Sequence, residues 1–315
     1  MYHIFDISLE SDLRLPELPE GDAREAVIKI ISGVDSMRVQ CEPDCFHEWQ
    51  DADGEICMLS AKIDSGYLLR FPDLVDFLIS STRNTVFYFP GPDIPEETIR
   101  HLILDQVIPR ILGQQGQLVL HASAVQLPDG KATIFLGDTG WGKSTIASSY
   151  YENGAQLITD DCLLIKIVDN KVFCVPNYYG LRLYPDSAQA IFKVNMQFKP
   201  VAHYTSKERL TLQSIESKMV EPIPVSAMFL LSDPNIGCVD SVSINKIRGA
   251  KEIMAIVEQS FLLDLQDKAI ISKQFTNASE VNEVSPVLYE LSYPRQYEML
   301  EEVRNTVKTI STNII

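Results

Sequence analysis

Short apolar segments separated by acidic turns occupy residues 1–90 of the chain. Six segments of this kind are rich in the β-branched and aromatic residues that favour strands. Residues 51–54, Asp-Ala-Asp-Gly, lie between two of them and predict a hairpin loop rather than a calcium loop, because the twelve-residue ligand spacing and flanking helices are missing. The region is therefore expected to be mostly β, with strands in the segments YHIFDI, AVIKIISG, FHEWQ, EICMLS, YLLRF and TVFYF.

The pattern changes at residues 90–116, where proline and glycine punctuation precedes a helical stretch that Pro109 is expected to kink or divide. We place a domain boundary near residue 91. The prediction is a β-rich N-terminal region, residues 1–90, for recognition or oligomerisation, followed by a larger domain over residues 91–315.

Strands and helices are mixed in the rest of the chain, which predicts an α/β domain. The pattern predicts strands at 117–125, 131–137, 155–167, 224–233 and 286–294, and helices at 145–154, near 249–266 and at 296–310.

A phosphate-binding loop is predicted between the second of these strands and the helix that follows it. The segment GDTGWGKS fits G-x-x-x-x-G-K-[ST], in which glycines let backbone amides approach phosphate oxygens at a helix N-terminus. The lysine is expected to reach the β- and γ-phosphates and the serine to ligate Mg²⁺. The nucleotide-binding residues are then Gly137, Asp138, Thr139, Gly140, Trp141, Gly142, Lys143, Ser144 and Thr145.

Two acids end the apolar run that follows this helix. Asp160 and Asp161 come at the carboxyl edge of the predicted sheet, where ligand sites of α/β proteins lie. Adjacent strand residues point to opposite faces, so one acid is expected to serve the metal and the other to face an acceptor. A helix or turn cap is the alternative for the second acid.

The net charge of −16 argues against binding to nucleic acid or to anionic membranes. With 45% hydrophobic and 22% charged residues, the chain has a globular composition, and no run reaches the ~18–20 apolar residues of a membrane span. An acidic start without a basic region and apolar core makes a cytoplasmic location the expectation. The six scattered cysteines are taken as reduced in preference to a metal site of Cys41, Cys45, His47 and Cys57.

The order LHASAV, GDTGWGKS and LITDD over residues 117–168 resembles the catalytic domain of the HPr kinase/phosphorylase family. The resemblance implies a P-loop kinase fold related to phosphoenolpyruvate carboxykinase, and phosphorylation of a serine hydroxyl on a small protein. It makes Asp161 the proton acceptor, His121 an active-site residue, and Asp160 a neighbouring acid that assists metal or geometry.

Departures from the family pattern argue against the reverse, phosphorylase activity and leave HPr itself open as the substrate. The family's glutamate after the loop serine is Thr145 here, and its glycine-rich signature is replaced by residues 179–186. Asp186 is a candidate to replace the metal-binding glutamate of that signature, with helix capping as the alternative.

Three further segments resemble HPr-kinase-like proteins encoded with lasso-peptide biosynthetic genes. They are FDISLESDLRLPELPEG, GLRLYPD and LYELSYPRQYEML. This resemblance implies an acceptor that is the C-terminal serine of a precursor peptide.

Basic residues outside the loop are candidates to stabilise charge on the transferring phosphate. Arg182 lies in the stretch just named, and Lys207 and Arg209 lie on a polar segment for which a solvated loop is the alternative. Trp141 is expected to cover the nucleotide or to pack.

The leading hypothesis is an ATP-dependent serine kinase that requires Mg²⁺ and acts on a peptide or small protein; a homo-oligomer is left open. A non-enzymatic nucleotide-binding regulator and a kinase for a small hydroxy molecule are the alternatives. ATP is preferred to GTP because the guanine-reading N-K-x-D element is missing from the sequence.

Overall fold

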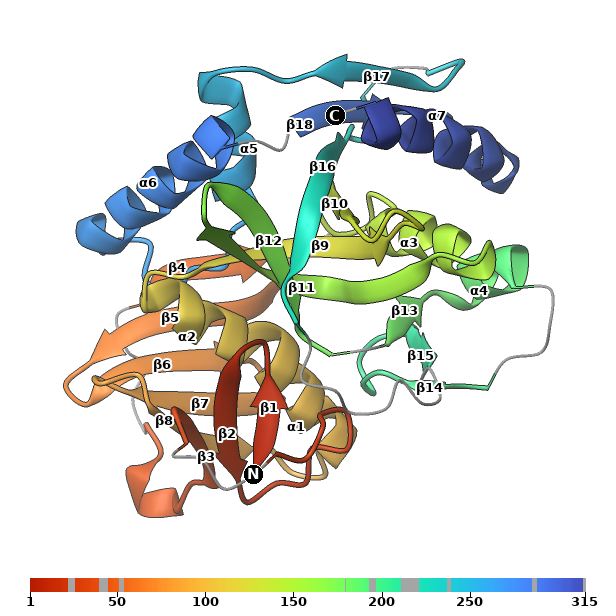
Figure 1. Ribbon diagram of the computed structural model, residues 1–315. Helices are drawn as coiled ribbons and strands as arrows, with labels where there is room; N and C mark the ends of the chain where they lie inside the picture. Colours follow the sequence, from red (N-terminus) through yellow and green to blue (C-terminus); the bar gives the residue numbers. More distant parts are fainter. Residues whose placement is uncertain are drawn as a thin grey trace. The chain divides into compact units, whose positions relative to one another are not determined.

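The chain folds into two compact units, each built around its own sheet. One unit is Met1–Gln117 with Leu262–Lys273, and the other is Leu118–Phe261 with Gln274–Ile315. Figure 1 shows the computed structural model, which describes residues 1–21, 26–39, 45–50, 54–178, 180–192, 197–210, 221–236, 239–284 and 288–313. The expected hairpin loop includes residues 51–53, and the alternative metal site of cysteines and His47 includes Cys41, so both lie partly outside these ranges.

An eight-stranded sheet forms the first unit, with strand order β1-β2-β3-β8-β7-β6-β5-β4. The six predicted strand segments are found as strands, and β2 and β7 are two additional strands that the sequence pattern did not single out. Its strands are β1 Tyr2–Ile4, β2 Ile7–Ser11, β3 Ile28–Ser32, β4 Cys45–Gln50, β5 Ile56–Ile63, β6 Gly66–Phe71, β7 Val75–Ser80 and β8 Thr85–Pro90.

The helical segment that follows belongs to this first unit. Helix α1 (Glu96–Leu102) continues through a π-helical turn, Ile103–Val107, into α2 (Ile108–Gln114). Pro109 directly follows this π-helical turn, an irregularity of the helix that divides it into two segments. The Arg110 guanidinium lies 5.2 Å from the ring centre of Trp49 on β4. The compact units therefore divide after Gln117 rather than near residue 91.

Residues 262–273 complete the first unit through buried polar contacts. The Tyr67 hydroxyl donates to Asp264 at 3.3 Å, and the Asp264 amide donates to the Gln114 side chain at 3.1 Å. Gln114 also donates to Asp267 at 3.0 Å. Asp264 and Gln114 are buried, so these bonds satisfy polar groups that would otherwise destabilise the unit.

A seven-stranded mixed sheet forms the second unit. β10 pairs with β9 and runs parallel to β16, which in turn runs parallel to β18. Antiparallel pairings of β9 with β11, β11 with β12, and β12 with β16 close a circuit of five strands. The strands are β9 Leu118–Gln126, β10 Ala132–Leu136, β11 Gln156–Val168, β12 Lys171–Pro176, β16 Ile223–Leu231, β17 Ser243–Lys246 and β18 Leu288–Ser292.

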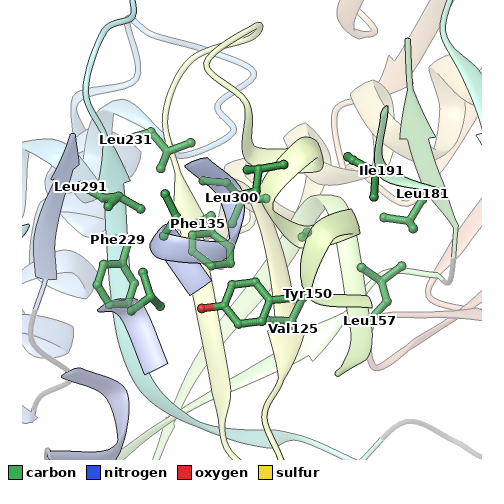
Figure 2. Packing of buried hydrophobic residues seen from close by; sticks show 14 of the residues in the cluster. Val125, Phe135, Tyr150, Leu157, Leu181, Ile191, Phe229, Leu231, Leu291 and Leu300 are labelled. Carbon is green, nitrogen blue, oxygen red and sulfur yellow. The ribbon is translucent and has the colours of Figure 1, made fainter. Parts of the chain in front are cut away.

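Hydrophobic clusters cover both faces of this sheet because successive strand residues point to opposite sides. On β10, Phe135 joins a cluster with α3, α4 and α7, whereas Ile134 joins one with α5 and α6. Figure 2 shows Phe135 beside Tyr150 of α3, whose hydroxyl donates to the Arg304 carbonyl of α7 at 3.0 Å. The helices are α3 Lys143–Glu152, α4 Pro185–Ile191, α5 Ala250–Glu258, α6 Lys268–Val284 and α7 Leu300–Asn313.

A small three-stranded sheet in the same unit has the order β13-β15-β14 (β13 Leu181–Leu183, β14 Phe198–Pro200, β15 Glu208–Leu210). It places Arg182 opposite Arg209 in strand register. No helix within the described ranges is long and apolar enough to cross a membrane.

Candidate functional site: a cavity over the phosphate-binding loop

The glycine-rich loop joins β10 to α3, in the predicted order of strand, loop and helix. Gly137, Gly140 and Gly142 have φ values of +141°, +85° and +95°, a region that side chains rarely adopt. A Cβ on Gly137 would also lie 2.9 Å from the Trp141 ring. The loop therefore depends on its glycines. Its backbone N–H groups and the N-terminus of α3 form a site that can bind an anion.

Lys143, the first residue of α3, folds back over the loop. Its ammonium donates to the carbonyl oxygens of Gly137 at 2.6 Å and Asp138 at 3.1 Å. Burial lowers the pKa of Lys143 to about 8, although the nearby charges of Asp161 and Asp160 oppose this shift. The charge that this lysine would present to a phosphate is thus sensitive to pH near 8.

We expect nucleotide affinity to fall as pH rises above about 8, the pKa of Lys143 in the free protein. A bound polyphosphate favours the ammonium form and raises this pKa, so binding takes up a proton where free Lys143 is neutral. Calorimetric titration with ATP in buffers of different ionisation enthalpy would measure the uptake. The Lys143→Arg variant, which stays charged, is the control, and equal pH dependence of affinity in both proteins would contradict the assignment.

A cavity of ≈ 250 Å³ lies over this loop, entirely within the second unit. Residues from Thr139 to Thr145 form one wall, and Asp161 and His121 face it from β11 and β9. Tyr184 and Ser187 from the start of α4 and Tyr293 to Leu300 after β18 complete the lining. The cavity thus brings the loop together with two of the site residues predicted from neighbouring strands.

A β-bulge in β11 precedes the two acids, which point to opposite faces of the strand. The pairing with β9 shifts register between Leu157 and Thr159, and Asp161 then has a φ of +97°. A non-glycine residue in this region costs about 1–3 kcal/mol, and such strain is concentrated at functional sites. Asp161 lines the cavity, whereas Asp160 does not.

Asp160 is buried and engaged by neighbours on both carboxylate oxygens. Ser123 donates to Oδ1 at 2.5 Å, and the backbone N–H of Arg182 donates to Oδ2 at 2.9 Å. Burial, and then the Asp161 charge, raise the pKa of Asp160 above its ordinary value. This geometry gives no support to Asp160 as a direct metal ligand; it holds Arg182 in place instead.

Arg182 connects the two acids from β13. Its side chain is 2% exposed, its Nη2 donates to the Asp160 carbonyl at 2.6 Å, and its Nη1 lies 2.5 Å from Asp161 Oδ2. Burial acts to raise the pKa of Asp161, but Arg182 and then His121 hold that pKa well below its ordinary value. Asp161 therefore carries a negative charge at neutral pH, where it is paired with Arg182.

His121 stands on the other side of Asp161. Its Nε2 lies 3.7 Å from Asp161 Oδ1, and its ring meets Phe261 in a T-shaped contact. Burial, followed by the Lys143 charge, lowers the pKa of His121 below 6.5. The imidazole is therefore neutral at pH 7 and can accept a proton, as Asp161 can.

The structure brings only part of the predicted accessory set to the cavity. Arg182 and Lys207 line it, and the Lys207 ammonium lies 5.4 Å from the ring centre of Tyr184. Arg209 instead donates to the Tyr178 hydroxyl at 3.2 Å. Asp186, in the first turn of α4, accepts a hydrogen bond from Tyr297 at 2.9 Å and does not line the cavity.

Sequence reasoning missed the wall formed by residues 293–297. A signal was available in YPRQY directly after the strand β18, because β10, β16 and β18 run parallel. The carboxyl ends of parallel strands meet at one sheet edge, so the segment after β18 lies at the same edge as the phosphate loop. Recognising it requires the strand pairing, which the chain pattern alone does not supply.

The residues present fit a nucleotide phosphate chain and one Mg²⁺ ion in part. Left-handed glycines, Lys143 and the start of α3 suit the phosphates, and Ser144 lines the cavity as a hydroxyl ligand. Across the described residues, no group of three or more His, Cys, Asp or Glu side chains could hold a metal. Because Mg²⁺ in such sites is held largely by phosphates and water, Ser144 is the residue that would contribute.

Comparison with solved structures finds distant likenesses to this chain. No family model and no curated protein matches the chain. Among solved structures, the Hpr(Ser) kinase/phosphatase from Coxiella burnetii is similar at 13% sequence identity and a TM-score of 0.32, over 61% of this chain and 97% of that one. Since the sequence identity and the TM-score are both low, the function of the chain must be derived from the cavity itself.

Proposed function

We propose that this protein is an ATP-dependent kinase that transfers the γ-phosphate to a serine hydroxyl of a peptide or small protein. One observation carries the proposal: Lys143 of the phosphate loop and the Asp161–His121 pair line the same cavity. A protein that only binds a nucleotide would not need a carboxylate and a neutral imidazole that face the bound phosphates.

The chemistry assigned to these residues is in-line displacement at the γ-phosphorus. The acceptor oxygen forms a bond to that phosphorus, the bond to the β–γ bridging oxygen breaks, and ADP leaves. The hydroxyl proton passes to Asp161 or to neutral His121 and then to solvent. Lys143 and the loop amides hold the phosphates, and Mg²⁺, when bound beside Ser144, would neutralise part of their charge.

The charges around the cavity suit this ligand in a protein that otherwise repels anions. Lys143, Lys207 and Arg295 are cations of the lining, while Arg182 and Asp161 compensate each other. The formal net charge of the chain is −16, so the attraction for a nucleotide must be local. Lys207, whose charge acts on His121 and Asp161, is assigned to the acceptor or to the transferring phosphate.

Mass spectrometry of acceptors incubated with the full-length protein, ATP and Mg²⁺ tests the proposal. We expect a peptide with an accessible serine to gain one phosphate, and the same peptide with alanine in its place to gain none. A lasso-type precursor peptide ending in serine, HPr and free serine separate the acceptor classes. ATP binding without transfer to any of them would favour a nucleotide-binding regulator and contradict the kinase.

A further inference from the structure

The segment after β18 contributes a half-buried arginine to the cavity. Arg295 lies with its guanidinium carbon 4.1 Å from the ring centre of Tyr293, and its Nη2 donates to the backbone carbonyl of Ser232, just after β16. Its position is therefore fixed from two sides by elements at the carboxyl ends of parallel strands.

The remaining terminal nitrogen of Arg295 faces the phosphate loop. Nη1 is buried and has no hydrogen-bond acceptor among the residues that the structure describes. A Cβ built on Gly142 would lie 3.8 Å from Nη1 and 3.2 Å from the Tyr293 hydroxyl, so both side chains stand directly beside the loop. A buried charged donor without an acceptor is costly, and an anion held by the loop would remove that cost.

We propose that Arg295 is a second cation of the phosphate site and that its Nη1 donates to the phosphate chain of the bound nucleotide. This inference rests on the proposed function, because it takes a nucleoside triphosphate as the ligand of the loop. An anion held beside Gly142 lies next to Nη1. Arg295 then holds the phosphate chain from the side of β18 while Lys143 holds it from α3.

The arrangement suits arginine better than lysine. A guanidinium can keep one nitrogen on the Ser232 carbonyl while another reaches a phosphate oxygen, and its plane stacks on the Tyr293 ring. A lysine ammonium would have to give up the stacking and one of the two partners. The proposal therefore makes Arg295→Lys a weaker binder even though the charge is kept.

Calorimetric titration of the full-length protein with ATP and with inorganic tripolyphosphate, each with Mg²⁺, tests this role. We expect Arg295→Met to weaken the binding of both probes by about 10- to 100-fold. Arg295→Lys should give an intermediate loss of about threefold or more. The matched control is Arg248→Met, which removes an exposed arginine outside the cavity lining and should bind both probes like the wild type.

Thermal unfolding separates this role from a structural one. If Arg295→Met unfolds near the wild-type temperature and binds both probes with wild-type affinity, the proposal is wrong. If Arg295→Met does not fold, Arg295→Lys decides, and wild-type affinity in that variant overturns the proposal. Nucleotide binding without phosphate transfer by the wild type would defeat only the kinase assignment, whereas a wild type that binds neither probe would defeat both.

Discussion

Asp161→Asn is expected to bind ATP with wild-type affinity and to transfer phosphate about 10²- to 10⁴-fold more slowly. The substitution preserves the shape of the side chain, and asparagine tolerates the left-handed backbone that Asp161 adopts. It removes the carboxylate that would accept the hydroxyl proton or orient the hydroxyl. Calorimetric binding of ATP and single-turnover transfer to a serine peptide that the wild type phosphorylates would measure the two effects separately.

Asp186→Asn is the matched control for this variant. Asp186 lies outside the cavity lining and accepts a hydrogen bond from Tyr297. Removing its negative charge should therefore leave the rate of phosphate transfer nearly unchanged. A His121→Gln variant shows which group takes the proton, because a larger rate loss there would make the neutral imidazole the acceptor. Undiminished transfer by Asp161→Asn would remove Asp161 from the chemistry.

Arg182→Met is expected to lower the free energy of unfolding by about 3–5 kcal/mol at pH 7 and to abolish transfer. The substitution keeps most of the side-chain volume but leaves the Asp161 carboxylate without its 2.5 Å partner and the Asp160 carbonyl without its donor. The Arg182 backbone bond to Asp160 remains. Denaturant unfolding, with activity measured on the folded fraction, would check both effects.

The stability loss in Arg182→Met should shrink in acid. In the wild type, the folded-state pKa of Asp161 is held well below its ordinary value, so its stabilising effect is complete above the unfolded pKa of about 4 and is lost as pH falls through the folded value. The variant lacks this contribution, and the difference in unfolding free energy between the two proteins therefore narrows below about pH 4. A pH-independent difference would contradict the ion-pair explanation.

Arg209→Met provides the control from the facing strand. Arg209 is the register partner of Arg182, and its guanidinium lies 5.4 Å from the Tyr178 ring centre, compared with 5.5 Å for Arg182. It also donates to the Tyr178 hydroxyl at 3.2 Å. Its removal should cost about 1 kcal/mol, with little dependence on pH between 4 and 7.

Features set by adjacent residues could be predicted from the sequence. The phosphate loop is one, because an apolar strand, left-handed glycines and a helix N-terminus follow one another directly. The different directions of Asp160 and Asp161 followed from strand geometry, and the structure shows Asp161 at the cavity and Asp160 away from it.

Features set by tertiary pairing could not be predicted. Hydrogen bonds from Ser123 and Arg182 occupy both oxygens of the Asp160 carboxylate, and a bulge follows Leu157. No local sequence pattern predicts either feature. Arg295 reaches the loop only because β16 and β18 are parallel neighbours. The helical segment before residue 117 joined the first unit through contacts with distant strands, which a composition change near residue 91 does not reveal.

The first unit is built from two separate segments of the chain, and this has a consequence for synthesis. Its last piece, residues 262–273, is separated from the first 117 residues by most of the second unit. During synthesis, Tyr67 and Gln114 gain their partners Asp264 and Asp267 only after residues 118–261 have been made. A fragment ending at residue 117 would leave those buried groups unpaired, so the chain is expected to mature as a whole rather than unit by unit.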